Sequence, residues 1–292
     1  MYKQIAANKR NTVFMMIGFV VFIAAIGAAF AYFADDWTVA FWVLIFATIY
    51  AVVQYFCATA LTVAMTGGRE IQKSDNPRLY NIVENLVITT GLPMPKVYII
   101  NDPAPNAFAT GRDPEHAIVA ATTGLLDIMD DKELTAVMAH EMSHVKNYDI
   151  RVSMIIFGLV CLVGVLADLA SRMLYYGNRR RDEERSPVGA ILLLAVAILS
   201  PIFAALAKLA VSREREYLAD MSAAHITRYP EGMISALKKL ETHSQPMKNQ
   251  NSATEAMYIN NPLRKGLLGD IFSTHPSIEK RIERLEHAKT SF

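Results

Sequence analysis

Long apolar stretches alternate with polar ones along this chain of 292 residues. Val13–Phe33 and Trp37–Met65 contain no charged residue, and each is long enough to cross a bilayer as a helix. Pro187–Ala207 is also uncharged and long enough, whereas Val152–Ala167 reaches that length only if it continues to Tyr176. The pattern therefore predicts an N-terminal pair of transmembrane helices and a second hydrophobic hairpin.

The apolar stretches divide the chain into four parts. We predict that the two polar parts form one domain, because together they are long enough for a compact core. The parts are a transmembrane helix pair (1–66), the first section of the polar domain (67–151), the second hairpin with spans near 152–176 and 187–207 (152–207), and the second section of the domain (208–292).

Charge near the apolar stretches indicates how the chain is oriented. Lys3, Lys9 and Arg10 precede the first stretch, and Asp35 and Asp36 follow it, so the N-terminus is expected on the cytoplasmic side. A cleaved signal peptide is the alternative, but the apolar run is too long and a second one follows at once. We therefore interpret the first stretch as an anchor.

The second hairpin has conflicting signals. Its connection, Gly177–Ser186, contains four arginines, which argue against translocation. Length and apolar composition favour crossing. The two stretches must both cross or both stay on the cytoplasmic face if the polar parts are to meet, and we expect them to cross.

The polar sequence predicts a small α+β unit. Pro77–Thr90 has the pattern of an amphipathic helix, and Lys96–Ile100 and His116–Thr123 are rich in β-branched residues, as strands are. Asn101–Gly111, rich in proline and asparagine, is expected to be a turn. Pro276 opens a last helix. This order suits a small metalloprotease core, in which an edge strand above the metal pairs with the substrate backbone.

The five residues from His140 to His144 read His-Glu-Met-Ser-His. On a helix, residues four apart face the same way, so both imidazoles can reach one ion while Glu141 lies beside them to deprotonate a water. Asp130 and Glu133 form a capping box that predicts such a helix. The spacing indicates a zinc hydrolase, and two surface histidines on an ordinary helix are the alternative.

A third ligand is needed, because catalytic zinc commonly takes three protein ligands and a water. The metzincin pattern would require Gly at 147 and His at 150, but the chain has Asn147 and Ile150. Glu216 and Asp220 follow the last apolar stretch and are four apart. One could bind the metal while the other orients a ligand; a juxtamembrane charge cluster is the alternative.

Several motifs occur together in order. They are Asn106-Ala-Phe-Ala-Thr-Gly111, His140-Glu141-x-x-His144 with Asn147 and Asp149, Ser212-Arg-x-Arg-Glu216-x-x-Ala-Asp220, and Thr274-His275-Pro276-Ser277. With the N-terminal spans, they resemble the HtpX family of membrane-bound zinc metalloproteases, which is related to the CAAX prenyl proteases. The resemblance covers almost the whole chain.

The resemblance implies a mainly α-helical membrane protein with a cytoplasmic, zincin-like α+β protease domain and a small β-sheet. It also implies a multi-pass zinc endopeptidase of the bacterial inner membrane that degrades damaged or misfolded membrane proteins under stress. The implied site comprises one Zn²⁺ held by His140, His144 and Glu216; Asp220 and Asn147 contacting the ligands; Glu141 and His275 in catalysis; and Asn106 on the substrate.

The chemistry and its surroundings point to particular partners. Glu141 would take a proton from the attacking water and pass it to the leaving amine. The expected partners are membrane-protein substrates and the lipid bilayer, with self-cleavage as a hazard in detergent. A net charge of +1 without a basic stripe excludes nucleic acid. A CAAX-type prenyl-protein protease and a membrane scaffold with structural zinc are the alternatives.

Overall fold

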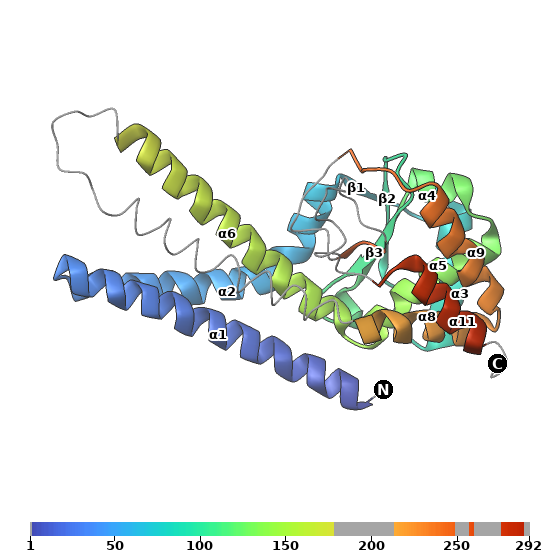
Figure 1. Cartoon of the computed structure of the whole chain (residues 1–292), viewed down its shortest axis with the longest axis horizontal. Helices are drawn as coiled ribbons and strands as arrows, with labels where there is room; N and C mark the ends of the chain where they lie inside the picture. Colours follow the sequence, from blue (N-terminus) through green and yellow to red (C-terminus); the bar gives the residue numbers. More distant parts are fainter. Residues whose placement is uncertain (1, 178–212, 249–256, 260–275, 289–292) are drawn as a thin grey trace.

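Long helices extend to one side of a smaller α+β unit (Figure 1). This is a computed structural model, and it describes residues 2–177, 213–248, 257–259 and 276–288. Among these residues helices predominate, and they accompany one small mixed sheet. The mainly helical fold class expected from the sequence is confirmed at this level.

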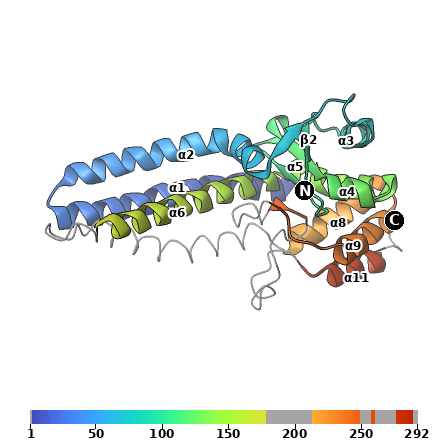
Figure 2. The ribbon, with the colours of Figure 1, turned by 90° about the horizontal axis from the view of Figure 1, so that it is seen from above.

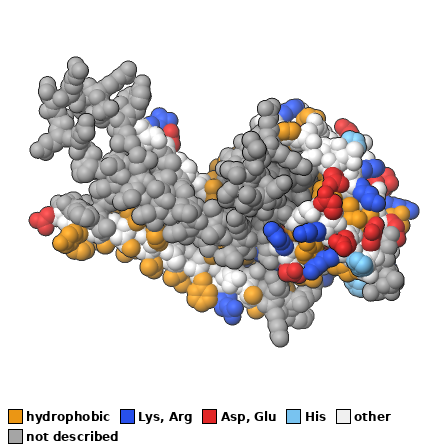
Figure 3. Space-filling model, viewed as in Figure 1, with side chains coloured by type: hydrophobic (Ala, Val, Ile, Leu, Met, Phe, Trp, Pro, Cys, Tyr) orange, Lys and Arg blue, Asp and Glu red, His pale blue; other side chains and the backbone are white. Residues whose placement is uncertain are grey.

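Helices α1 (Tyr2–Ala34) and α2 (Trp37–Thr66) contain the two N-terminal apolar stretches. Their segments Ile5–Ala28 and Ala40–Thr66 are, within the described parts of the chain, the ones long and apolar enough to cross a membrane. Gly67 ends α2 in the left-handed conformation, with φ of 69°. Hydrophobic side chains follow α1 along the lower edge of the molecule, whereas charged side chains gather over the α+β unit (Figure 3).

Helix α6 (Asp149–Gly177) contains the third apolar stretch and runs beside α1 and α2 (Figure 2). Two side chains of α2 bond to its backbone: the Tyr50 hydroxyl donates to the Gly158 carbonyl at 2.7 Å, and Gln54 Nε2 donates to the Met154 carbonyl at 3.0 Å. The expected fourth stretch, residues 187–207, lies outside the described residues. Crossing by the second hairpin therefore stays a prediction.

The sheet has four strands in the order β1-β2-β4-β3. The central pair, β2 and β4, is parallel, and both outer strands run antiparallel to their neighbours. The edge strand β3 is therefore paired on one side by β4. The strands are β1 (Gly68–Glu70), β2 (Lys96–Ile100), β3 (Ala107–Thr110) and β4 (Ile118–Thr122).

The strand expected at His116–Thr123 is confirmed as β4, but with shorter bounds, Ile118–Thr122. His116 instead ends a 3₁₀ turn, Pro114–His116, because the Asp113 carboxylate accepts the N–H of His116 at 2.9 Å. At the other end of the expected strand, Thr123 begins helix α4 (Thr123–Ile128). The expected turn Asn101–Gly111 contains β3, which is too short to have its own alternating pattern and forms by pairing with β4.

Alternation along the strands separates two cores. Val97 and Val119 pack on the helices of the α+β unit, whereas Ile118 and Ala120 pack with residues of α6 such as Phe157. The sheet is thus held between the domain helices and the ends of the long helices. The predicted bounds of α3 and β2 are confirmed. The domain helices are α3 (Pro77–Thr90), α5 (Asp131–Lys146), α8 (Arg213–Thr227), α9 (Pro230–Thr242) and α11 (Ile278–Ala288).

Candidate metal centre

Helix α5 presents two imidazoles to one point. The predicted capping box is present, with Asp130 accepting the N–H of Glu133 and the Glu133 carboxylate accepting the N–H of Asp130. This cap fixes where the helix begins, so His140 and His144 lie one turn apart on the same face. Their Nε2 atoms are 3.2 Å from one another, and His140 is almost fully buried.

Helix α8 brings a carboxylate to the same point. The Glu216 oxygens lie 3.7 Å from Nε2 of His140 and 3.6 Å from Nε2 of His144. One donor atom from each of the three residues lies within 4.8 Å of the other two. Two nitrogens at zinc-bonding distance from a tetrahedral ion are separated by about 3.4 Å. The spacing and the donor types therefore fit zinc.

The second ring nitrogen of His140 points at a carboxylate. Nδ1 lies 3.0 Å from Oδ1 of Asp220, one turn after Glu216 on α8. Burial would raise the pKa of Asp220, but the Arg281 guanidinium and the His140 ring together outweigh burial and lower it. Burial lowers the pKa of His140 despite Asp220, which favours the neutral ring that a metal ligand needs.

The second ring nitrogen of His144 also meets a carboxylate. Nδ1 lies 3.1 Å from Oδ2 of Asp149, the first residue of α6. The other oxygen, Oδ1, accepts a hydrogen bond from Asn8 at 2.7 Å and one from Arg215 at 3.4 Å. Burial would lower the pKa of His144, but Asp149 and Glu216 outweigh burial and raise it to about 9 without a metal. Protons and metal therefore compete for this ring.

Glu141 lies beside the histidines and is almost fully buried. Burial raises the pKa of its carboxyl to about 7; Glu216 adds to the rise, while His144 and a hydrogen bond from the Ala109 backbone amide oppose it. A carboxyl that titrates near neutral pH can both accept and return a proton. The position of Glu141 beside the two histidines is that of a general base.

Strand β3 passes beside this carboxylate, and part of its outer edge is bonded to the chain itself. The Ala107 carbonyl accepts the N–H of Ile259 at 3.0 Å, and Phe108 forms an antiparallel bridge with Tyr258. Ala109, two residues after Ala107, presents its amide to Glu141 from the same edge. The described segment 257–259 thus pairs with the strand nearest the general base.

Asn106 lies at the start of β3 and is buried. Its side-chain oxygen accepts the N–H of Ala107 at 3.1 Å, and its Nδ2 lies 3.6 Å from the sulfur of Met247. The side chain is therefore engaged by its own surroundings, and the contact with substrate expected for Asn106 stays a prediction. His275, expected to act in catalysis, lies outside the described residues.

Asn147, expected to contact the ligands, ends helix α5. Its carbonyl accepts a hydrogen bond from Nδ2 of Asn8 at 2.9 Å, so Asn147 is linked to the site through Asn8. Asp149, two residues later, is the residue that contacts the His144 ring. Asp149 belongs to the motif that follows the His pair, and its contact with the ring shows a role that the motif by itself does not specify.

Arg281 and Asn8 were not predicted from the sequence. Arg281 is almost fully buried in α11, three residues after Ile278 and four before Leu285, on the face that packs into the core. A lone arginine on an apolar helix face signals a buried partner. Asn8 gives no comparable signal, because nothing in sequence links the first residues of α1 to a site more than a hundred residues away.

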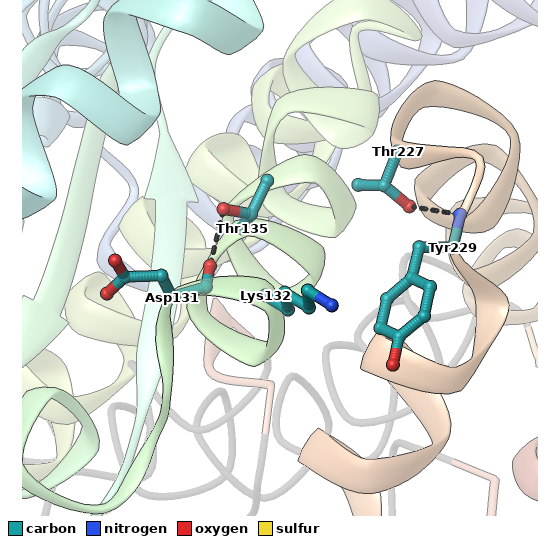
Figure 4. A pocket seen from close by; sticks show the side chains of 5 residues that line it. All are labelled: Asp131, Lys132, Thr135, Thr227 and Tyr229. Carbon is teal, nitrogen blue, oxygen red and sulfur yellow. Dashed lines mark hydrogen bonds between the residues drawn. The ribbon is translucent and has the colours of Figure 1, made fainter.

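A surface pocket of about 360 Å³ lies at the other end of α5 (Figure 4). Lys132 reaches over the ring of Tyr229, with Nζ 4.8 Å from its centroid. No residue of the candidate metal centre lines this pocket, so it is separate from the site. The lining residues are Asp131, Lys132, Thr135, Thr227 and Tyr229.

Comparison with known proteins gives a consistent family. The profile of peptidase family M48 matches residues 73–289. A "Protease HtpX homolog" of Tropheryma whipplei (strain Twist) is 52% identical over 292 residues, covering 100% of both chains. Homologues with the same name from Lactobacillus acidophilus and Dictyoglomus thermophilum are 44% and 45% identical, covering 98% and 97% of this chain and 99% and 93% of their own.

A solved structure shares the fold. The crystal structure of S. mikatae Ste24p superposes with a TM-score of 0.54 at 18% sequence identity, covering 98% of this chain and 67% of that one. At this identity the likeness concerns the fold alone.

Proposed function

Because the chain belongs to peptidase family M48 and resembles HtpX homologues over its full length, we propose that it is a zinc-dependent endopeptidase. The family profile and the HtpX homologues identify the chain as a membrane-associated protease. The single observation that carries the zinc assignment is the convergence of His140, His144 and Glu216 within 4.8 Å, with Glu141 beside them. That combination has a use in hydrolysis and none in a structural zinc site.

The protein residues have distinct tasks in the proposed reaction. Zinc, when bound, supplies Lewis acidity that polarises the scissile carbonyl and makes water a better nucleophile. Glu141 accepts the proton of the attacking water at its carboxylate and returns it to the leaving nitrogen. Asp149 accepts from Nδ1 of His144, and a carboxylate oxygen of Asp220 lies 3.0 Å from Nδ1 of His140, so that both Nε2 atoms are left for the metal.

We propose that an extended substrate pairs with the outer edge of β3, as a strand added to the sheet. The Ala107 carbonyl and the Ala109 amide are the backbone groups of that edge. Since the N–H of Ile259 bonds to the Ala107 carbonyl, a substrate using this edge must first displace the 257–259 segment. Asn106, at the start of the strand, would contact the substrate backbone after the same displacement.

The proposed substrates are damaged or misfolded membrane proteins. The support is the connection of the site to the long helices: α6 begins at Asp149, which contacts His144, and α1 contributes Asn8. A site at the base of these helices suits a substrate already held in the bilayer. The basic N-terminus supports a cytoplasmic position for this side, and the HtpX names support a bacterial inner membrane.

The function is tested with the full chain in lipid nanodiscs, loaded with one equivalent of zinc. Glu141→Gln should keep the zinc and lower cleavage of casein and of a destabilised membrane protein by at least about 100-fold, the lower limit for a general base. Glu283→Gln, at an exposed position of α11, is the matched control and should cleave like the parent.

Two results would contradict the proposal. Near-parental cleavage by Glu141→Gln would remove Glu141 from its role, and zinc binding without turnover in the parent would favour a structural metal. Preferential cleavage of a prenylated peptide over unmodified membrane proteins would replace the substrate class while leaving the metal chemistry intact.

A further inference from the structure

Asn8 is a buried polar residue near the start of the N-terminal membrane helix. It is 3% exposed, whereas Asn11 on the same helix is exposed. Its Nδ2 donates to Oδ1 of Asp149 at 2.7 Å and to the carbonyl of Asn147 at 2.9 Å. A side-chain amide nitrogen has two hydrogens, so these bonds use both of its donors.

The two acceptors lie at the junction between α5, which bears the His pair, and α6. Between them, Tyr148 adopts φ of 60°, a conformation that is uncommon for residues other than glycine. Lys9, next to Asn8, places Nζ 4.2 Å from the centroid of the Tyr148 ring. The start of α1 therefore holds the junction at three successive residues, Asn147, Tyr148 and Asp149.

Asp149 transmits this contact to the site, because its other oxygen lies 3.1 Å from Nδ1 of His144. The chain of contacts runs from Asn8 through one carboxylate to one ring; Asn8 and Asp149 are buried, and His144 is partly buried. In this setting a donor on Oδ1 fixes the rotation of the carboxylate, which in turn fixes the orientation of the imidazole.

We propose that Asn8 is a positioning residue for the metal: it holds Asp149 against His144 and makes metal affinity depend on how α1 docks at the α5–α6 junction. The inference rests on the proposed zinc site. It gives the first membrane helix a second task besides anchoring, since Asn8 lies within the candidate span Ile5–Ala28. Displacing α1 from the junction would loosen the His144 ring.

The test measures zinc affinity and does not need proteolysis. The full-length chain carries Glu141→Gln, so that self-cleavage cannot occur, and zinc affinity in nanodiscs is measured by competition with a chromophoric chelator. Asn8→Ala should weaken zinc binding about tenfold, at the lower end of the range for groups that support metal ligands. Asn11→Ala, the matched control, should bind zinc like the parent. Equal affinities for the two variants would overturn the proposal.

A double-mutant cycle tests whether Asn8 acts through Asp149. In an Asp149→Ala background, Asn8→Ala should add little further loss, whereas an undiminished loss would overturn the proposed route. The unfolding temperature of the metal-free protein identifies any variant that is generally unfolded. If Asn8→Ala is unfolded, Asn8→Ser takes its place, because serine keeps one hydrogen-bond donor. Its zinc affinity should fall less than tenfold. If Asn8→Ser and Asn11→Ala both bound zinc like the parent, the proposal would again be overturned.

These outcomes separate the inference from the proposed function. If the parent chain bound zinc tightly but cleaved no substrate, the proposed protease function would be contradicted. The effect of Asn8→Ala on zinc affinity could still be measured. If the parent chain cleaved its substrates but Asn8→Ala left zinc affinity unchanged, the proposed function would be supported and the role of Asn8 would be contradicted.

Discussion

Arg281 of α11 forms a two-pronged ion pair with Asp220 of α8: Nε donates to Oδ2 at 2.8 Å and Nη2 to Oδ1 at 2.6 Å. Both side chains are almost fully buried. Asp220 in turn contacts His140, so this pair ties the last described helix to the metal centre. The planar fork matches the carboxylate and sets its orientation.

Removing this guanidinium should damage both stability and the site. Arg281→Ala leaves a buried carboxylate without its main partner, which typically costs about 3–5 kcal/mol. Zinc affinity should fall as well, because Asp220 no longer holds the His140 ring. Thermal unfolding of the metal-free chain and a chelator titration measure the two effects.

Arg284→Ala is the matched control for that experiment. Arg284 lies on the same helix, is half exposed, and pairs with Glu214 at 3.3 Å. Surface pairs of this kind contribute about 0–1 kcal/mol. If Arg281→Ala were as mild as Arg284→Ala, the buried pair would have no structural importance.

Acid should weaken the fold through Glu133. Burial would raise its pKa, but hydrogen bonds from Lys239, Ser235 and the Asp130 backbone outweigh burial and lower it. A carboxyl whose folded pKa lies below its ordinary value of 4.5 contributes stability above that pH and loses it as the pH falls further. Glu133→Gln should therefore cost about 1–3 kcal/mol at neutral pH and reduce the loss of stability below pH 4.5.

The control for Glu133 is the same substitution at an exposed pair. Glu84 accepts from Lys73 at 2.7 Å, and both side chains are well exposed. Glu84→Gln should change stability at neutral pH by less than about 1 kcal/mol. The free energy of unfolding is measured with denaturant between pH 3 and 7. If Glu133→Gln and Glu84→Gln lost the same amount of stability below pH 4.5, the role assigned to Glu133 would be refuted.

The packing of α2 on α6 depends on Gly158. A Cβ at this position would lie 2.0 Å from Nε2 of Gln54 and 2.2 Å from its Cγ. Gly158→Ala should push Gln54 away from the Met154 carbonyl and destabilise the chain by about 1–3 kcal/mol, a typical loss for overpacking. The unfolding temperature in detergent is the measurement.

Gly164, on the same helix, provides the comparison. A Cβ there meets nothing within 4 Å. Gly164→Ala should be neutral or slightly stabilising, because alanine is the better helix former. An unfolding temperature that falls equally in both variants would mean that helix association does not depend on the contact with Gln54.

Release of the β3 edge should favour substrate binding. Ile259→Pro removes the N–H that bonds to the Ala107 carbonyl. Since one hydrogen bond contributes about 1 kcal/mol, KM for an extended peptide should fall about fivefold, with kcat little changed. Ile259→Ala keeps the N–H and controls for the loss of the buried side chain. A KM that stays at the parental value in Ile259→Pro, or falls equally in both variants, would rule out competition at this edge.

Local sequence determined the parts of this protein that depend on short-range patterns. The bounds of α3 and β2, the capping box at Asp130, the two apolar N-terminal helices and the one-turn spacing of the His pair all follow from residues a few positions apart. The carboxylates at 216 and 220 also share a helix, so their common face could be expected.

Tertiary structure alone decided what lies around the histidines. Strand β3 exists because β4 pairs with it, and its edge meets Ile259 only through the fold. Asn8 and Arg281 come from opposite ends of the chain and reach the two carboxylates behind the metal ligands. Hydrogen bonds and charge pairs act over a few ångströms, and no pattern along the chain encodes which distant residues folding will bring within that range.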